Sequence, residues 1–170
     1  MTGIAKFKNV VEEKFGRVDH LVSSIGAAWF KGPLSQQSTS EFNKVIGDLA
    51  TSHFILGKAF LPWMSKQEGS TYTIITGAAG EGLSDPKGSL MTVGAATLFG
   101  ISMAFRREFE HDPLLVNEYR IAVRVVKPED VKQSWENSNE VFANEFLRSL
   151  NEVIEKKTRS QVIRLASLPK

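Results

Sequence analysis

The amino-acid sequence predicts an α/β protein in which a parallel sheet of about four strands is flanked by helices. Segments with apolar residues at helical spacing alternate with short runs rich in Val, Ile and Leu, and this helix–strand order occurs four times along the chain. Such alternation is typical of a parallel sheet that is covered by helices on both faces. Because crossovers between parallel strands are right-handed, few arrangements of the strands remain.

The first half of the chain contains two predicted helices and one predicted strand. An amphipathic helix begins near the N-terminus and ends at Gly16, and a strand follows over residues 18–26. Ser38 and Glu41 form a capping box, in which a hydroxyl and a carboxylate satisfy the free amides at a helix start. The apolar stripe of the helix that they open continues to Met64.

The second half completes the alternation. Its predicted elements are a strand over Thr71–Thr76, a helix from about Ser89 to His111, a strand over Arg120–Val126, a helix containing Phe142 and Phe146, and a strand over Gln161–Leu165. Asp112 and Pro113 are expected to end the long helix, because the residue before a proline disfavours helical backbone angles. No linker divides the chain, so residues 1–170 are expected to form one domain.

Composition excludes several classes of function. The net charge of +2 comes from 21 basic and 19 acidic residues, which are interleaved, so neither nucleic acid nor an anionic membrane is an expected partner. The absence of Cys excludes disulfides, thiolate metal sites and Cys nucleophiles. His20, His53 and His111 are too scattered to predict a metal site.

The stretch from Gly88 to Phe105 carries no charge and approaches the length of a membrane span. Its many Gly, Ser and Thr residues favour a different interpretation, a helix buried between a sheet and a partner helix. We therefore expect no membrane insertion. Because the N-terminus has no apolar signal core, a cytoplasmic location is expected.

Four sequence motifs, which occur in the correct order, resemble motifs of the short-chain dehydrogenase/reductase family. They are GRVDHLVSSIGA, FNKVIGDLATSHFILGKAFLPWM, GSTYTIITGAAG and YRIAVRVVKPEDV, and each is similar to a strand or helix motif of that family. The resemblance covers essentially the whole chain but only the C-terminal two thirds of the family fold. It implies a partial Rossmann-like, doubly wound sheet.

The resemblance also assigns the family's catalytic positions, and this chain departs from all of them. The catalytic Asn, Ser, Tyr and Lys of the family fall on Leu49, Gly77, Met91 and Ala95. None of these side chains donates or accepts a proton, so the resemblance implies that hydride-transfer catalysis is lost. No catalytic residue is therefore expected at these positions.

No cofactor is expected either. In the family, a strand, a glycine-rich turn and a helix bind the dinucleotide pyrophosphate, and this unit would precede the present chain. We therefore do not expect high-affinity NAD(P) binding. Residues 76–82, TGAAGEG, fall one residue short of that motif, and Glu129 or Asp130 would then contact the ribose. Because residues 83–88 intervene before the helix, a plain turn is the favoured interpretation.

Several side chains are candidates for lining a pocket at the former active site. Trp29 is open to two interpretations, a pocket wall or an interface residue, and His53 is more simply a hydrogen-bonded core histidine than a catalytic base. Asp85 and Lys127 are candidates that also fit an ordinary solvated surface. The full set of possible pocket residues is Ser24, Gly26, Trp29, His53, Thr76, Asp85, Met91, Lys127 and Pro128.

Three hypotheses about function follow. The first is a non-catalytic binding or assembly subunit, because members of the family commonly pair through two long helices, here residues 40–64 and 89–109. The partner would be a second copy or another protein. The second hypothesis is a repurposed enzyme, such as a cyclase or isomerase, that uses the old pocket for an apolar substrate. The third is a fragment of an NAD(P)-dependent oxidoreductase.

Overall fold

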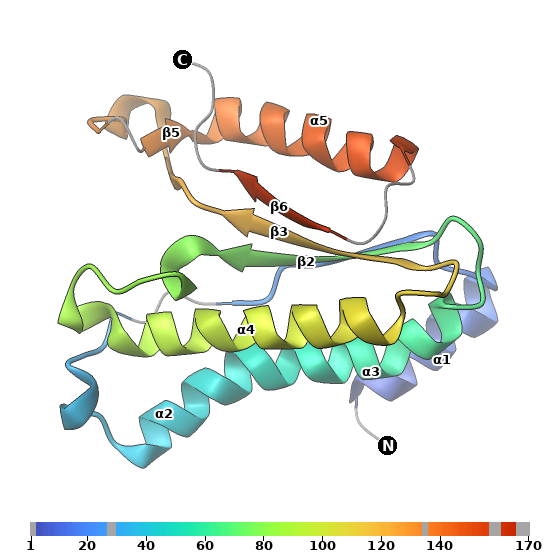
Figure 1. Ribbon diagram of the computed structural model, residues 1–170, viewed down its shortest axis with the longest axis horizontal. Coiled ribbons are helices and arrows are strands. Elements are labelled where there is room, and N and C mark those ends of the chain that lie inside the picture. Colours follow the sequence, from blue (N-terminus) through green and yellow to red (C-terminus); the bar gives the residue numbers. More distant parts are fainter. Residues whose placement is uncertain (1–2, 27–29, 134–135, 157–160, 166–170) are drawn as a thin grey trace.

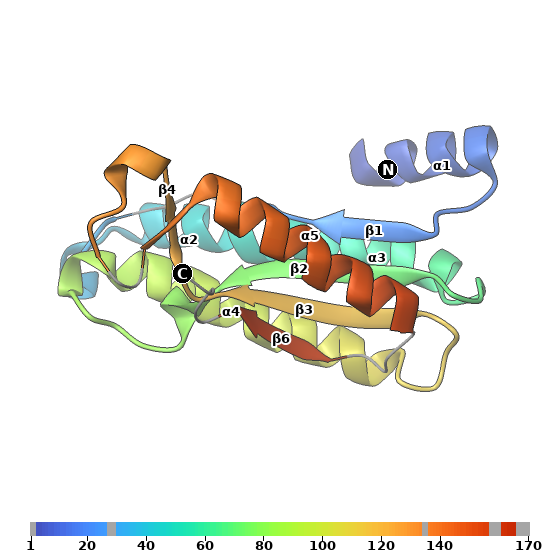
Figure 2. The same cartoon turned by 90° about the horizontal axis from the view of Figure 1, so that it is seen from above.

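A computed structural model describes residues 3–26, 30–133, 136–156 and 161–165. In this part of the chain, a four-stranded parallel sheet lies between helices (Figure 1). Helix α5 covers one face of the sheet, and α2, α3 and α4 lie on the other, with α1 packed against α3 (Figures 1 and 2). The helices are α1 (Gly3–Phe15), α2 (Thr39–Ile46), α3 (Ser52–Met64), α4 (Ser89–Glu108) and α5 (Asn139–Lys156).

The strands of the main sheet lie in the order β1-β2-β3-β6, so β1 and β6 are its edges. A second sheet of two short strands, β4 and β5, follows β3. The strands are β1 (His20–Ser23), β2 (Thr71–Gly77), β3 (Leu115–Ile121), β4 (Arg124–Val126), β5 (Glu136–Ser138) and β6 (Val162–Leu165). The predicted fold class, an α/β layer with a parallel sheet of about four strands flanked by helices, is confirmed.

The main core lies between the sheet and helices α3 and α4. Alternate residues of β2 and β3, among them Ile74 and Val116, point to this side, where they meet Phe60 and Phe105. A smaller core on the opposite face joins Tyr119 to Phe146 of α5, whose rings meet edge to face with centroids 5.1 Å apart. Both cores bury strand residues, which is why β2 reads as a nearly continuous buried run.

The helix predicted over residues 40–64 is present, but a π-helical turn divides it into α2 and α3. It begins as expected, because the Ser38 hydroxyl accepts a hydrogen bond from the Glu41 amide at 3.1 Å. Between α2 and α3, residues Gly47–Thr51 form a π-helical turn. Such turns often occur at functional sites, and this one contains the buried Leu49.

The strand predicted over Arg120–Val126 and the predicted long helix have other boundaries in the structure. The strand expected over Arg120–Val126 begins earlier, at Leu115, and ends at Ile121, and the following residues leave the main sheet to form β4. Asn117 and the fully buried Glu118 lie in its centre, where polar residues obscure a strand pattern. Helix α4 also ends earlier than expected, at Glu108.

Helix α4 with its preceding turn, Pro86–Glu108, is long and apolar enough to cross a membrane by length and composition. A buried core helix passes the same test, and α4 buries Leu90, Leu98 and Phe105 against its neighbours. Tertiary packing therefore accounts for the apolar residues on the buried side of this helix.

Candidate functional site

A cavity of about 320 Å³ lies where β1 and β2 end and α4 begins. In open α/β sheets, ligands bind at the carboxyl ends of the strands, and the cavity is in that place. The described residues that line it are Ser24, Ile25, Gly26, Leu49, Ile75, Thr76, Gly77, Ala79, Met91, Ala95 and Leu98.

Close helix packing positions the walls of this cavity. A Cβ atom at Gly94 would lie only 2.5 Å from Leu49 Cδ1, so the π-helical turn approaches α4 as closely as a glycine allows. A Cβ at Gly80, in the short turn Ala78–Gly80 after β2, would lie 2.6 Å from the Ala96 backbone nitrogen. The two glycines thus let both neighbouring segments pack tightly on α4.

Four of the predicted pocket residues line the cavity together: Ser24, Gly26, Thr76 and Met91. The positions that the family resemblance assigns to catalysis also meet here, since Leu49, Gly77 and Ala95 complete the same wall. These residues come from four separate segments of the chain. Among the described lining residues there is no ionisable side chain, and Ser24 and Thr76 supply the only hydroxyls.

The other predicted pocket residues lie elsewhere or outside the described residues. Asp85 is exposed and caps a short turn by accepting a hydrogen bond from the Lys87 amide at 2.8 Å. Lys127 and Pro128 are exposed beyond β4 and do not line the cavity. Trp29 is outside the described residues.

His53 lies behind the cavity wall, fully buried, and ties β1 to α3. Its Nε2 lies 2.9 Å from the Ile25 carbonyl oxygen, which only accepts, so Nε2 carries the proton. Nδ1 then accepts a hydrogen bond from the Ser23 hydroxyl at 2.7 Å. Burial lowers the pKa of His53, although the bond to Ile25 opposes the shift. His53 is therefore neutral and holds the segment that forms one side of the cavity.

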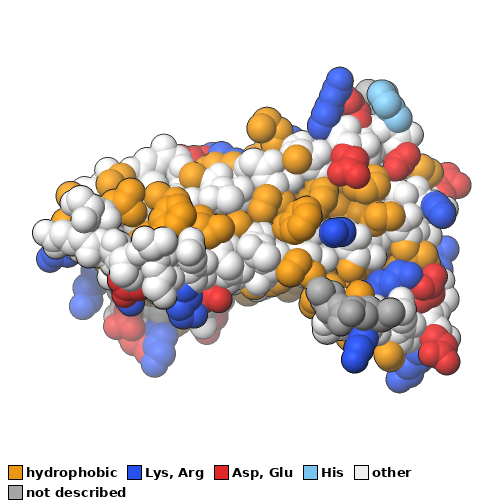
Figure 3. All heavy atoms as spheres, turned by 90° about the horizontal axis from the view of Figure 1, so that it is seen from below, with side chains coloured by type: hydrophobic (Ala, Val, Ile, Leu, Met, Phe, Trp, Pro, Cys, Tyr) orange, Lys and Arg blue, Asp and Glu red, His pale blue; other side chains and the backbone are white. Residues whose placement is uncertain are grey.

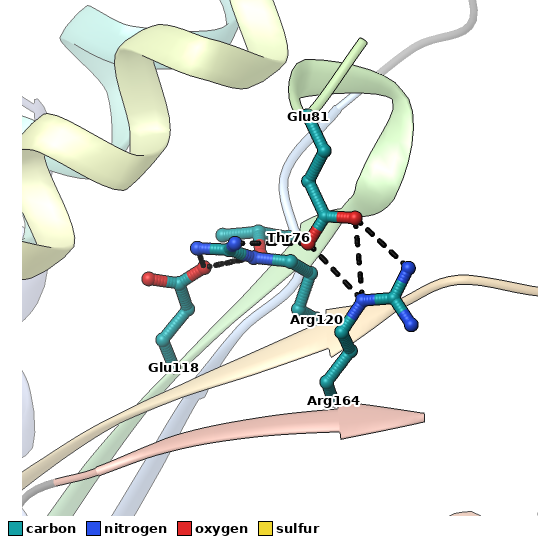
Figure 4. A network of polar contacts seen from close by, with 5 residues as sticks. All are labelled: Thr76, Glu81, Glu118, Arg120 and Arg164. Carbon is teal, nitrogen blue, oxygen red and sulfur yellow. Dashed lines mark hydrogen bonds and ion pairs between the residues drawn. The ribbon is translucent and has the colours of Figure 1, made fainter. Parts of the chain in front are cut away.

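Sequence reasoning missed a network of charged side chains (Figure 4), which reaches the cavity through Thr76 of its lining. The buried Glu118 accepts hydrogen bonds at Oε1 from the Thr76 hydroxyl at 2.9 Å and from Arg120 Nε at 2.8 Å. Arg120 reaches on to Glu81 at 3.0 Å, and Arg164 of β6 donates to the same carboxylate at 2.9 Å. The only sequence signal was an acidic residue, Glu118, two positions before the arginine at which the predicted strand over Arg120–Val126 begins.

Electrostatics stabilise this network. Hydrogen bonds from Arg164 and then Arg120 lower the pKa of Glu81 to about 2. Burial disfavours the charge on Arg120, but its bonds to Glu118 and Glu81 outweigh burial, so the pKa of Arg120 is raised. The Arg120 guanidinium also lies 3.7 Å from the centre of the Phe99 ring on α4.

A second, larger depression of about 640 Å³ lies at the opposite end of the sheet, and Lys66, Glu68, His111 and Asp112 are among its lining residues. It is at the amino ends of the strands, away from the usual ligand side. In the described part of the chain, no cluster of three or more His, Asp or Glu side chains is suited to hold a metal ion.

The glycine-rich segment after β2 does not open a helix. Ala78–Gly80 forms a short turn, and exposed residues lead on to a second turn, Pro86–Gly88, before α4 begins at Ser89. Phosphate binding by a glycine-rich motif requires the glycines to lead directly into the helix N-terminus. Residues 76–82 therefore do not have the geometry that the phosphate-binding interpretation requires, and they form the turn that was the favoured interpretation.

The parallel sheet and the cavity at its carboxyl edge define a Rossmann-like protein. A family model described as enoyl-(acyl carrier protein) reductase matches residues 2–136, which is most of the chain. The chain therefore belongs to the short-chain dehydrogenase/reductase family. A search of curated proteins finds no significant match.

Solved structures of the family share this fold. An enoyl-[acyl-carrier-protein] reductase (NADH) from Aquifex aeolicus VF5 superposes with a TM-score of 0.75 at 18% identity, over 95% of this chain and 66% of that one. A metagenomic short-chain oxidoreductase in complex with NADP gives 0.75 at 21% identity, over 98% and 69%. A halohydrin dehalogenase gives 0.79 at 18% identity, over 100% and 76%. The chain spans about two thirds of the length of the first two.

Proposed function

We propose that this protein is a non-redox member of its family that acts as a binding or assembly subunit. The observation that carries the proposal is the cavity at the carboxyl ends of β1 and β2, whose described lining has no ionisable side chain. Reduction of a carbonyl by hydride needs a proton donor beside the oxygen. Met91 and Ala95 occupy the positions where the family resemblance expects that donor and its supporting lysine, and neither supplies a proton.

The proposal extends to the cofactor. Tight binding of a dinucleotide needs backbone amides and a helix N-terminus directed at the pyrophosphate. The turn after β2 is separated from α4 by the exposed residues 81–87 and so does not provide this geometry. We therefore expect the chain by itself to bind neither NADH nor NADPH tightly.

The assembly surface in this proposal is the outer side of α3 and α4. Phe54 is 46% exposed and Met103 63% exposed there, and Ala96, Gly100 and Ala104 form an uncharged, exposed stripe on α4. Figure 3 shows apolar side chains gathered along this side of the molecule. Large exposed apolar surfaces commonly mark contacts with other proteins, and small residues let a second helix approach closely. A second copy of the chain is the partner that we propose.

The assembly part is tested by size-exclusion chromatography with light scattering. The wild-type chain is expected to elute as a dimer, and Gly100→Glu, which places a charge in the centre of the stripe, is expected to be a monomer. Leu147→Glu is the matched control, because Leu147 is 55% exposed on α5 at the opposite face. A wild-type monomer at tens of micromolar concentration would contradict this part of the proposal.

The non-redox part is tested by mixing the purified chain with NADH or NADPH and a panel of aldehydes and ketones. No oxidation of the cofactor above the buffer rate is expected, and titration with either nucleotide is expected to leave tryptophan fluorescence unchanged. Steady turnover would contradict the proposal directly.

A repurposed enzyme is the second candidate. The observation in its favour is that Ser24 and Thr76 bring two hydroxyls to an otherwise apolar cavity. Conversion of an apolar substrate without any nicotinamide cofactor would favour this candidate over a purely binding or assembly role.

A further inference from the structure

We propose that the cavity between β2 and α4 binds a neutral, largely apolar small molecule, which enters past a rim formed by Phe30, Leu83 and Met91. This inference rests on the non-redox role proposed above and names the class of ligand for the same site. Its evidence is the chemistry of the lining, the side chains at the mouth, and the way in which the surrounding charges are already paired.

The lining disfavours a charged ligand. Its described residues are aliphatic, small or hydroxyl-bearing, and none carries a charge to pair with an ionised group. Moving an unpaired ion from water into such a site costs at least roughly several kcal/mol of solvation free energy. Burial of an apolar group is instead favourable.

The charged side chains linked to Thr76 pair with one another, although Oε2 of the buried Glu118 has no hydrogen-bond partner in the described part of the chain. The Arg120 guanidinium donates to Glu118 and to Glu81, and it lies over the Phe99 ring (Figure 4). Arg164 donates to Glu81. Thr76, which lines the cavity, directs its hydroxyl hydrogen to Glu118 rather than to a ligand. Beside Thr76, a ligand therefore meets an apolar surface, and the Thr76 hydroxyl oxygen can accept a hydrogen bond from it but cannot donate one.

Apolar side chains from three segments meet beside Met91 of the cavity wall, and we place the mouth of the cavity there. Phe30 is 65% exposed and Leu83 is 50% exposed, and both lie beside the first turn of α4. A Cβ atom at Gly88 would be 4.0 Å from Phe30 Cζ and 3.8 Å from both Leu83 Cδ1 and Met91 Cε. Met91 also lines the cavity, so the rim continues into the interior. Exposed apolar side chains grouped at a concave site are typical of ligand entry.

The two segments that carry the rim are held in place. On one side, the Lys31 carbonyl accepts a hydrogen bond from the Leu90 amide at 3.3 Å, and a Cβ at Gly32 would lie 1.8 Å from the Pro86 carbonyl oxygen. On the other side, Arg120 and Arg164 hold Glu81, two residues before Leu83. A mouth that is already formed costs little conformational entropy when a ligand binds.

The size of the cavity limits the ligand. At about 320 Å³ it lies at the small end of ligand pockets, which span roughly 300–1,000 Å³. A compact bicyclic or short-chain molecule fits this volume better than a dinucleotide does.

The test uses N-phenyl-1-naphthylamine, a neutral fluorophore that brightens in apolar sites. Saturable binding, with one probe per chain, is expected. Displacement is then compared for three molecules with one skeleton, 2-naphthalenemethanol, 2-naphthoate and 2-naphthylmethylammonium. The neutral alcohol is expected to displace the probe at a concentration about tenfold or more below that of either ion.

Two glycine variants locate the binding site. Gly77 lines the cavity with extended backbone angles, φ −121° and ψ 143°, and a Cβ there meets no atom within 4 Å. Gly77→Leu is therefore expected to fill the cavity without strain and to weaken probe binding by about tenfold or more. Gly3→Leu is the matched control, because a Cβ there also meets nothing within 4 Å, but at the exposed start of α1, which belongs neither to the cavity lining nor to the proposed assembly surface. It is expected to keep wild-type probe affinity.

Three results would overturn the inference: no saturable binding, equal binding by a charged analogue, or full affinity in Gly77→Leu with unchanged circular dichroism. Carbonyl reduction with NADH or NADPH, measured separately, would instead overturn the proposed function. Loss of the expected probe binding without such reduction overturns the ligand class alone.

Discussion

Arg164 of β6 donates hydrogen bonds to both carboxylate oxygens of Glu81, with its Nε 3.1 Å from Oε1 and its Nη2 2.9 Å from Oε2. The two residues are 83 positions apart in the sequence. Arg120 of β3 donates to the same carboxylate at 3.0 Å. Glu81 therefore connects the loop after β2 to the ends of two further strands, beside the candidate cavity.

This arrangement predicts an acid-dependent contribution to stability. The arginines lower the pKa of Glu81 from 4.5 to about 2, so the folded state holds the carboxylate more strongly in its charged form than the unfolded state does. The contribution is complete above pH 4.5 and is lost as the pH falls from 4.5 to about 2. Thermal melting of Glu81→Gln compared with wild type is expected to show a gap at pH 6 that narrows toward pH 2.5. A gap that stays constant with pH would contradict this account.

Thr76→Val is expected to destabilise the fold. The substitution keeps the side-chain shape but removes the hydrogen bond to the buried Glu118 carboxylate, and hydrogen bonds to charged groups contribute roughly 1.5–3 kcal/mol. Urea unfolding measures the change in free energy. Thr97→Val is the control, because the Thr97 hydroxyl donates only to the Val93 carbonyl within α4, and a loss below about 1 kcal/mol is expected there. Equal losses in the two variants would argue against a special role for Glu118.

His53 predicts a second pH dependence. Because burial lowers its pKa in the folded state, the unfolded chain takes up the proton more readily. The stability that depends on neutral His53 is complete above pH 6.5 and decreases as the pH falls below 6.5. Melting temperatures of wild type and His53→Gln are expected to differ more at pH 8 than at pH 5.5. A difference that grows toward acid would reverse the sign and refute the prediction.

Gly80→Ala is expected to destabilise the protein by about 1–3 kcal/mol, the usual cost of overpacking. Its new Cβ would lie 2.6 Å from the Ala96 backbone nitrogen, and a backbone atom cannot move aside as a flexible side chain does. Gly82→Ala is the control, since a Cβ at Gly82 meets nothing within 4 Å. Chemical denaturation of both variants measures the contrast, and an unchanged Gly80→Ala would show that α4 and the turn after β2 can separate freely.

The sequence by itself determined the class of fold and the order of its elements. Local information was sufficient because periodicity, the capping pair Ser38 and Glu41, and the apolar run of β2 each depend on neighbours close in the chain. The sequence motifs also indicated the family, and the family-model match over residues 2–136 confirms it.

Only the tertiary structure decided which residues share the site. The residues around Glu118 do not have the pattern of a central strand. The side chain that makes the buried Glu118 acceptable is Thr76, which is 42 positions away in the sequence and lies on the neighbouring strand of the sheet. In the same way, Leu49, Gly77 and Met91 meet around one cavity because a π-helical turn, a strand end and a helix start pack together. Asp85 and Lys127 resembled candidates in the sequence but lie outside that wall, since nothing in a linear pattern states where a loop side chain points.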